Sequence, residues 1–135
     1  MYQNILVPVA IGHGGTTDTA LKIARALCDE GGKITLLNVA EPLHAEVSQY
    51  IPADVLEENK ESVRAELRAL AAGIGGAQVE VLRGSPGITI TEYAGEHKVD
   101  LIIVASHRPG LRDYFLGSTA ARVVRHAECA VHVVR

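Results

Sequence analysis

The most constraining feature of this sequence is the short apolar run from Leu101 to Ala105. An uninterrupted apolar run of this length is typical of a strand buried on both faces, as in a parallel sheet. A polar loop follows, and then the small-residue triplet Gly117-Ser118-Thr119. Apolar residues behind the triplet recur at helical spacing, so this segment predicts a strand, a loop and a helix in that order.

The start of that predicted helix is a candidate anion site. A helix that begins at Gly117-Ser118-Thr119 presents free backbone N–H groups, two hydroxyl groups and the positive end of its dipole. His107 and Arg108, at the end of the strand, would add donors. The alternative is that Ser118 or Thr119 only caps the helix and that His107 and Arg108 are solvated loop residues.

The rest of the chain repeats this alternation of strand and helix. Further strands are predicted at residues 4–10, 33–40, 77–83 and 130–135. A first helix, capped within residues 16–18, carries Cys28 on its apolar face and ends at Gly31-Gly32. A second helix is predicted over 53–73, and a third begins at Gly84-Ser85-Pro86 although residues 88–91 alternate like a strand.

Five strands alternating with four helices predict a single α/β domain over residues 1–135, with a parallel sheet and right-handed crossovers. Periodicity does not give the strand order. It does predict a ligand site at the carboxyl ends of the strands, where the winding reverses. The glycine-rich turn at residues 11–15 and the loop after the fourth strand both lie at those ends.

Charge and composition exclude several kinds of partner. The net charge of −3 argues against general electrostatic binding to nucleic acid, and only 4% of residues are aromatic. No apolar run approaches the roughly 20 residues of a membrane span, and the first residues are typical of a strand and not of a signal peptide. We therefore expect a cytoplasmic protein with neither nucleic acid nor membrane as partner. Cys28 and Cys129 are expected to be structural small hydrophobic residues, and not a disulfide or a zinc site.

The catalytic motifs considered do not fit. Residues 12–15 are similar to a dinucleotide fingerprint, but Thr17 stands where its last glycine would be. Neither a P-loop nor a nucleophile elbow is present. The six histidines do not form HxxxH or HExxH, so no metal ligand is assigned, although Asp113 or Glu128 could hold a magnesium ion beside a phosphate. No catalytic residue is predicted.

Four segments together resemble the universal stress proteins along nearly the whole chain: NILVPVA, KITLLNVAEP, RGSPGITITEYAGEHKVDLIIVASHR and LGSTAARVVRHAECAVHVVR. The resemblance implies a three-layer αβα sandwich with a five-stranded parallel sheet in the order 3-2-1-4-5, a Rossmann-like nucleotide-binding fold. It also implies ATP or AMP binding in the crevice between strands one and four, and a homodimer formed through the terminal strand, Ala130 to Val134.

The family's nucleotide motif, Gly-x2-Gly-x9-Gly-Ser/Thr, falls here on Ala105, Arg108 and Gly117-Ser118. Only the closing pair is kept, and the last spacer is one residue shorter. The ASHRP sequence resembles a small single-domain bacterial branch of the family, so we interpret it as a variant loop in which Arg108 supplies positive charge.

The end of the first strand departs from the family as well. Ala10 stands where the family often has an Asp near the ribose, and an unpaired ribose hydroxyl would weaken binding by about 1–3 kcal/mol. The resemblance places the base near Pro8, Val9 and Val39, with Ala10 beside the ribose. The phosphates would lie over Ala105, Ser106, His107, Arg108, Gly117, Ser118 and Thr119.

The sequence therefore predicts a homodimeric stress-response or signalling protein that binds ATP, or AMP or ADP, with Mg²⁺ as a potential companion. No catalysis is assigned beyond slow ATP hydrolysis or self-modification. The competing hypothesis is a stress-related homodimeric interaction module that binds no nucleotide, which Ala10 and the missing loop glycines favour. In that case the terminal strand and the long charged helix would bind a protein partner.

Overall fold

The structure is a computed structural model, which describes residues 1–11, 14–106 and 116–135. Strands and helices alternate along these ranges. The strands are β1 Tyr2–Pro8, β2 Cys28–Ala40, β3 Gln78–Arg83, β4 Leu101–Ala105 and β5 Ala130–Val134. The helices are α1 Gly14–Leu27, α2 Ala45–Ser48, α3 Ala53–Ala72, α4 Pro86–Glu96 and α5 Ser118–His126.

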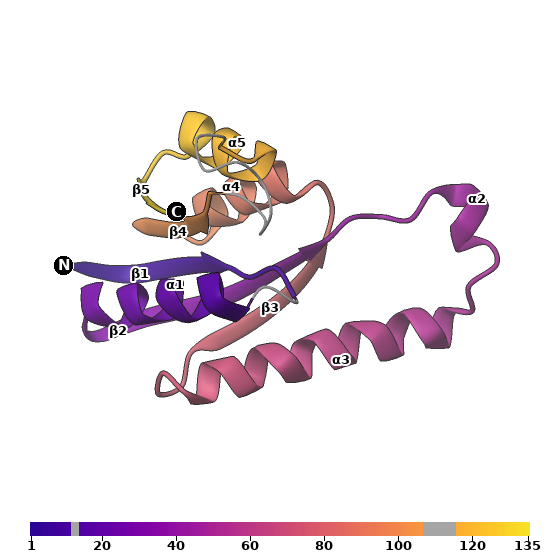
Figure 1. Cartoon of the computed structure of the whole chain (residues 1–135), viewed down its shortest axis with the longest axis horizontal. Coiled ribbons are helices and arrows are strands. Elements are labelled where there is room, and N and C mark those ends of the chain that lie inside the picture. The colour runs from indigo at the N-terminus through magenta and orange to yellow at the C-terminus, as the bar shows by residue number, and fades with distance from the viewer. Residues whose placement is uncertain (12–13, 107–115) are drawn as a thin grey trace.

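The strands form one five-stranded parallel sheet in the order β3-β2-β1-β4-β5 (Figure 1). Residues of α1 and α3 pack in one apolar cluster with the sheet, and residues of α4 and α5 pack in a second. The three layers and the strand order expected from the resemblance are confirmed. The order also places β3 and β5 at the two edges of the sheet.

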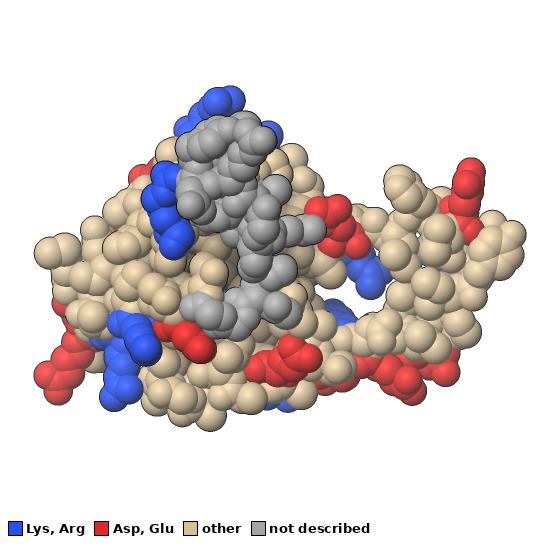
Figure 2. All heavy atoms as spheres, in the orientation of Figure 1, with Lys and Arg blue, Asp and Glu red and all other residues tan. Residues whose placement is uncertain are grey.

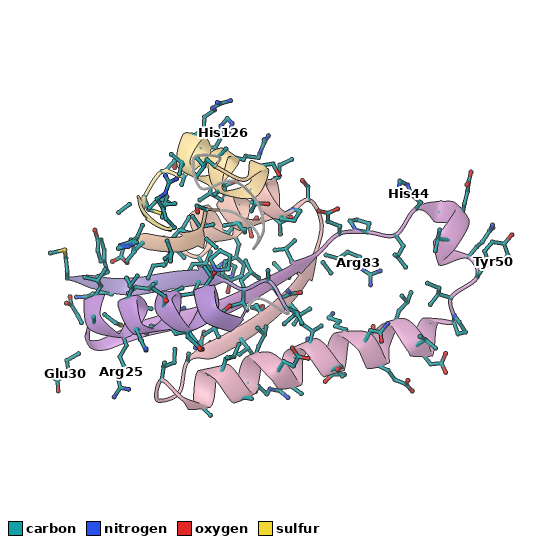
Figure 3. All side chains as sticks on the ribbon, in the orientation of Figure 1. Arg25, Glu30, His44, Tyr50, Arg83 and His126 are labelled. Atoms are coloured by element: carbon teal, nitrogen blue, oxygen red, sulfur yellow. The ribbon has the colours of Figure 1, made fainter. Side chains whose placement is uncertain are left out.

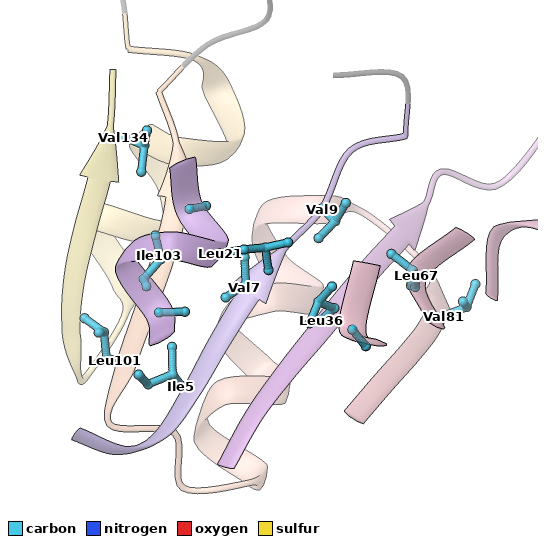
Figure 4. Packing of buried hydrophobic residues seen from close by; sticks show 13 residues of the cluster. Ile5, Val7, Val9, Leu21, Leu36, Leu67, Val81, Leu101, Ile103 and Val134 are labelled. Atoms are coloured by element: carbon cyan, nitrogen blue, oxygen red, sulfur yellow. The ribbon is translucent and has the colours of Figure 1, made fainter. Parts of the chain in front are cut away.

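Alternate side chains of the central strands supply the two apolar clusters. Ile5 and Val7 of β1 face α1 and α3, where Leu67 lies fully buried (Figure 4), and Leu6 faces α4 and α5. The same alternation runs through β4, which is why its apolar run is continuous. Aliphatic residues make up both clusters almost entirely, in keeping with the low aromatic content.

The first helix differs from the prediction at both ends. It begins at Gly14, so residues 16–18 lie inside it and do not cap it, and it ends at Leu27. Cys28 already belongs to β2, and Gly31-Gly32 lie within that strand. The pairing explains this: Tyr2 is opposite Cys28 but Asn4 is opposite Lys33, so the extra residues of β2 form a bulge. Gly31 in this bulge has φ +79°, a conformation that glycine adopts easily.

The third predicted helix is confirmed as α4. Ser85 occupies the N-cap position, although its side chain makes no capping hydrogen bond, and Pro86 is the first helical residue. Ile90 and Ala94 are buried against the sheet. Tertiary packing therefore overrides the strand-like alternation of residues 88–91.

The amino edge of the sheet is held by the side chains of Asn4, in β1, and Asp100, in the turn before β4. Asp100 accepts hydrogen bonds from the backbone N–H groups of Gln3 and Asn4, each at 2.9 Å. The Asn4 side-chain amide donates to the carbonyl oxygens of His97 and Lys98, at the end of α4. This clasp joins the start of β1 to the turn that leads into β4.

The connection between β2 and α3 leaves the body of the protein and carries α2 at its far end (Figure 1). This four-residue helix was not predicted from the sequence. Leu67 and Ala71, in the C-terminal half of α3, are the residues of that helix that are buried against the sheet. Among the described residues, no helix combines the length and apolarity needed to cross a bilayer.

Candidate functional site

The sheet opens at the carboxyl ends of its two central strands. The pairing of β1 with β4 consists of Ile5 with Leu101 and Leu6 with Ile102, yet β1 continues to Pro8 and β4 to Ala105. Each strand keeps its other neighbour to the end, Pro8 with Leu37 and Ala105 with Val134. The strands thus separate where the winding of the sheet reverses, and this is where ligands bind in open α/β sheets.

The start of α5 is attached directly to the end of β4. Ser106 follows the strand, is buried, and donates its backbone N–H to the carbonyl oxygen of Val134 at 2.8 Å. The carbonyl oxygen of Ser106 in turn accepts a hydrogen bond from the backbone N–H of Gly117. Residues 106 and 117 therefore close the loop between them and place the N-terminus of α5 at the carboxyl edge of the sheet.

Gly117, and neither Ser118 nor Thr119, is the N-cap residue of α5. The first hydrogen bond within the helix runs from the N–H of Ala121 to the carbonyl oxygen of Gly117, at 2.8 Å. The N–H groups of Ser118, Thr119 and Ala120 precede it, so they have no acceptor within the helix. Ser118 is exposed and Thr119 half-buried. This end of the helix can therefore bind an anion through backbone groups and the helix dipole.

The end of β1 is fixed by an asparagine of β2. The backbone N–H of Val9 donates to the carbonyl oxygen of Leu37 at 2.8 Å. The Nδ2 atom of Asn38 donates to the carbonyl oxygen of Val9 at 2.9 Å. Ala10, the next residue, is exposed, and Pro8 is half-buried. The chain is thus held in place up to the exposed Ala10 at the carboxyl edge of the sheet.

The two valines predicted near the base have their side chains on opposite faces of the sheet. Val9 is buried in the cluster beneath α1 and α3. Val39 is half-buried and packs with the cluster beneath α4 and α5. The structure brings the backbones of Val9 and Val39 to the same edge of the sheet but does not bring their side chains together.

The predicted site residues fall into three groups. Pro8, Val9, Ala10 and Val39 lie at the ends of β1 and β2, and Ala105, Ser106, Gly117, Ser118 and Thr119 lie at the junction of β4 and α5. His107 and Arg108 lie outside the described residues, as does Asp113.

Asn38 is a residue of this edge that the sequence analysis did not single out. It is half-buried, and its hydrogen bond to Val9 connects β2 to the end of β1 at this edge. A signal was available, because Asn38 is a polar residue within the otherwise apolar segment Leu36 to Ala40. Such a side chain in a central strand needs a partner, and here the partner is backbone at the site.

Two other hollows lined by described residues lie at the opposite, amino edge. One, with a volume of about 560 Å³, lies between the ends of α4 and α5 and includes Glu92, His126 and Cys129. The other lies between the ends of α1 and α3, beside Cys28 and Gly75. Neither hollow includes a predicted site residue, so the candidate site rests on the separation of β1 from β4 and on the N-terminus of α5.

Among the described residues, the titratable groups with a resolved pKa shift lie away from the candidate site. In the described ranges, the pKa values raised above their ordinary range are those of Cys28, Tyr93 and Cys129, chiefly because burial disfavours their charged forms. None of these residues belongs to the carboxyl edge. Over the same part of the chain, no three His, Cys, Asp or Glu side chains are placed to hold a metal ion. The described site can bind and orient a ligand, and it presents no group poised for proton transfer.

Known proteins with similar sequences and folds support this geometry. The sequence model of the universal stress protein family matches residues 1–135. Universal stress protein G of Salmonella typhimurium is 33% identical over 145 residues, with 100% of each chain covered. Universal stress protein G of Escherichia coli O157:H7 is 30% identical over 143 residues, again with 100% of each chain covered.

Solved structures share the fold over nearly the whole chain. The hypothetical protein MJ0577 matches with a TM-score of 0.83 and 24% identity, covering 99% of this chain and 96% of that one. A universal stress protein solved in complex with cAMP matches with a TM-score of 0.69 and 23% identity, covering 99% and 97%. The universal stress protein from Archaeoglobus fulgidus in complex with dAMP matches with a TM-score of 0.67 and 18% identity, covering 99% of this chain and 98% of that one. The chain therefore belongs to the universal stress protein family.

Proposed function

We propose that this protein binds an adenine nucleotide, and ATP more tightly than AMP, in the crevice between β1 and β4. The observation that carries the proposal is the separation of these strands directly beside the N-terminus of α5. A crevice for the base and ribose then adjoins a site for phosphates. The complexes of two relatives with cAMP and dAMP support the same ligand class.

The phosphates would bind the backbone N–H groups at the start of α5. Gly117 has no side chain to keep a phosphate away, and Ser118 adds an exposed hydroxyl group. Ala105, Ser106, His107 and Arg108 would form the other side of this phosphate site, with Thr119 behind it. More phosphates mean more charge beside the helix dipole, so we expect ATP to bind more tightly than AMP.

The base and ribose would lie against Pro8, Val9 and Val39. The N–H and carbonyl groups of Val9 already have protein partners and its side chain is buried, so Val9 would position the end of β1 beside the ligand. Ala10 offers no side-chain acceptor for a ribose hydroxyl group. We therefore expect weaker ribose discrimination than a carboxylate at this position would give, by about 1–3 kcal/mol.

The remaining parts of the proposal concern assembly and chemistry. Two copies would pair through β5, which lies at an edge of the sheet and exposes Ala130 and His132. Mg²⁺ would bind to the phosphates of ATP. The protein would act in the cytoplasm in a stress response or in signalling, with at most slow ATP hydrolysis or self-modification.

A second candidate function follows from Ala10. Ala10 supplies no acceptor for a ribose hydroxyl group, which is also what we expect of an interaction module that binds no nucleotide. Such a module would keep the dimer through Ala130–Val134 and would bind a protein partner along the charged face of α3.

Replacing Gly117 by valine tests the assignment of the phosphate site. The φ of −60° at this residue is accessible to valine, so the added side chain mainly obstructs the approach of a phosphate. We expect Gly117→Val to weaken ATP binding at least tenfold, a loss of about 1.4 kcal/mol or more. Gly95→Val, at an exposed position in α4 with open space around its Cα, is the matched control and should bind as the wild type does. Equal affinity of the two variants would contradict the site assignment.

A further inference from the structure

The connection from β2 to α3, together with the first turns of α3, forms a projecting arm that we define as residues 41–59. Figure 1 shows this arm extending away from the sheet, with α2 at its far end. The space-filling view shows it standing clear of the body, with acidic side chains along its surface (Figure 2). The arm takes no part in the candidate nucleotide site described above.

Large apolar side chains are concentrated on this arm. Leu43, Val47, Tyr50 and Val55 are 42%, 49%, 80% and 39% exposed. Figure 3 shows Tyr50 at the tip of the arm, pointing away from the protein. The other exposed large apolar residues of the described chain are scattered over the N-terminus, α4, the residue before Gly117, and α5. Several exposed large apolar side chains on one projecting element favour a binding surface.

Acidic residues are also concentrated on the arm. Residues 41–59 contain five acidic residues and neither Lys nor Arg, so the arm has a formal charge of −5 although the whole chain has −3. The remaining residues therefore carry a net charge of +2. The acidic residues, all exposed, are Glu41, Glu46, Asp54, Glu57 and Glu58. Apolar side chains surrounded by carboxylates favour a partner that is itself apolar and positively charged.

We propose that this arm binds a short cationic amphipathic segment of another protein. The apolar side of such a segment would cover Val47, Tyr50 and Val55, and its Lys or Arg side chains would pair with the surrounding carboxylates. Because the surface is small, the complex is expected to be transient, with a dissociation constant in the micromolar range. The proposal is independent of nucleotide binding.

A second copy of this chain does not fit the arm as well. Two arms facing each other would bring like charges together. The helix α5 exposes two arginines, Arg122 and Arg125. Its one exposed large apolar residue is Val124. The like charges of two facing arms therefore favour a foreign partner over a second copy.

The test uses the full chain and a synthetic helical peptide with leucines at positions i, i+3, i+4 and i+7 and lysines elsewhere. Binding is measured by fluorescence anisotropy of the labelled peptide at two salt concentrations. A scrambled peptide of the same composition, which has no apolar face, is the peptide control. We expect the amphipathic peptide to bind in the micromolar range and the scrambled peptide at least tenfold more weakly.

Two variants of the arm separate its apolar and charged contributions. Val47→Ser with Tyr50→Ser should weaken binding about tenfold, while Val124→Ser, at an equally exposed valine of α5, should not. Glu57→Gln with Glu58→Gln should weaken binding mainly at low salt, while Glu30→Gln, at an exposed position of β2 far from the arm (Figure 3), should have little effect. All the substituted side chains are exposed, so the variants are expected to fold.

The proposal is overturned if the amphipathic peptide does not bind, if the scrambled peptide binds equally well, or if the arm variants bind like their controls. Analytical sedimentation of the wild-type chain tests whether a second copy of the chain covers the arm instead. If the chain self-associates and Val47→Ser with Tyr50→Ser abolishes that association, a second copy covers the arm and the proposal of a foreign partner is wrong.

Discussion

The Nδ2 atom of Asn38 lies 2.9 Å from the carbonyl oxygen of Val9, and this hydrogen bond connects β2 to the end of β1 at the edge where the nucleotide site is proposed. It is part-buried, and it acts just beyond the last paired residue of β1, Pro8 opposite Leu37. The course of the chain into Ala10 therefore depends on one side chain of the neighbouring strand.

Asn38→Ala tests this dependence. The substitution leaves the part-buried carbonyl of Val9 without its partner, which should lower the free energy of unfolding by about 1–2 kcal/mol. Urea denaturation measures the change. Asn59→Ala, at an exposed position of α3, is the control and should alter stability little. Equal stabilities of the two variants would mean that the Asn38 hydrogen bond contributes nothing.

The clasp at the amino edge makes a second prediction. Asp100→Ala removes the acceptor of two backbone N–H groups, those of Gln3 and Asn4, and should destabilise the protein by about 2–3 kcal/mol. Asp100→Asn keeps one acceptor oxygen and should cost less. The exposed Asp18→Ala in α1 is the control, and thermal unfolding is the measurement. A loss no larger than that of Asp18→Ala would contradict the role of the clasp.

Lys98 ends α4 with a backbone that suits glycine better than lysine. Its φ is 55°, and the hydrogen bonds from Lys98 to Gly95 and from Val99 to Ala94 form a Schellman-type helix end. Lys98→Gly should therefore stabilise the protein by about 0.5–1 kcal/mol. Lys22→Gly, at an exposed position inside α1, should instead destabilise it by about 1 kcal/mol. Unfolding curves that shift in the same direction for both variants would contradict the assignment.

The two cysteines should make thiol alkylation and the free energy of unfolding depend on pH in the alkaline range. Burial raises the pKa of Cys28 and of Cys129, so both thiols stay protonated at a pH where a free thiol begins to ionise. Alkylation in the folded protein should be slower than in urea near pH 8. Since the folded pKa values exceed the unfolded ones, the associated stability is present below the ordinary thiol pKa and is lost as the pH rises through the folded values.

Replacing both cysteines separates this effect from other alkaline changes. Cys28→Ala with Cys129→Ala should lose less stability between pH 8 and pH 10 than the wild type does. An identical decline in the two proteins, or alkylation as fast in the folded as in the unfolded chain, would show that the thiols are not protected.

Much of the fold follows from apolar periodicity, and the exceptions have physical causes. The run from Leu101 to Ala105 is continuous because both faces of β4 are covered. The prediction that Cys28 lies in a helix is wrong, because the pairing with Tyr2 that takes Cys28 into β2 joins distant segments. The strand order came from the family resemblance, since periodicity within one segment carries no information on which strands are neighbours.

Part of the candidate site could likewise be predicted from local sequence, and part could not. Gly117 and Ser118 could be predicted because a small-residue helix start after a buried strand has a local signature. The separation of β1 from β4 beyond Leu6 and Ile102 could not, because it is a property of two strands distant in sequence. The same holds for the position of Val9 and Val39 on opposite faces, which depends on the pairing of β1 with β2.

Nucleotide binding in the β1–β4 crevice is tested by calorimetric titration of nucleotide-stripped protein with ATP and Mg²⁺, with AMP as the comparison. We expect saturable binding that is tighter for ATP than for AMP, because the additional phosphates bind at the start of α5. Absence of binding up to millimolar ATP would contradict it and would favour the interaction module.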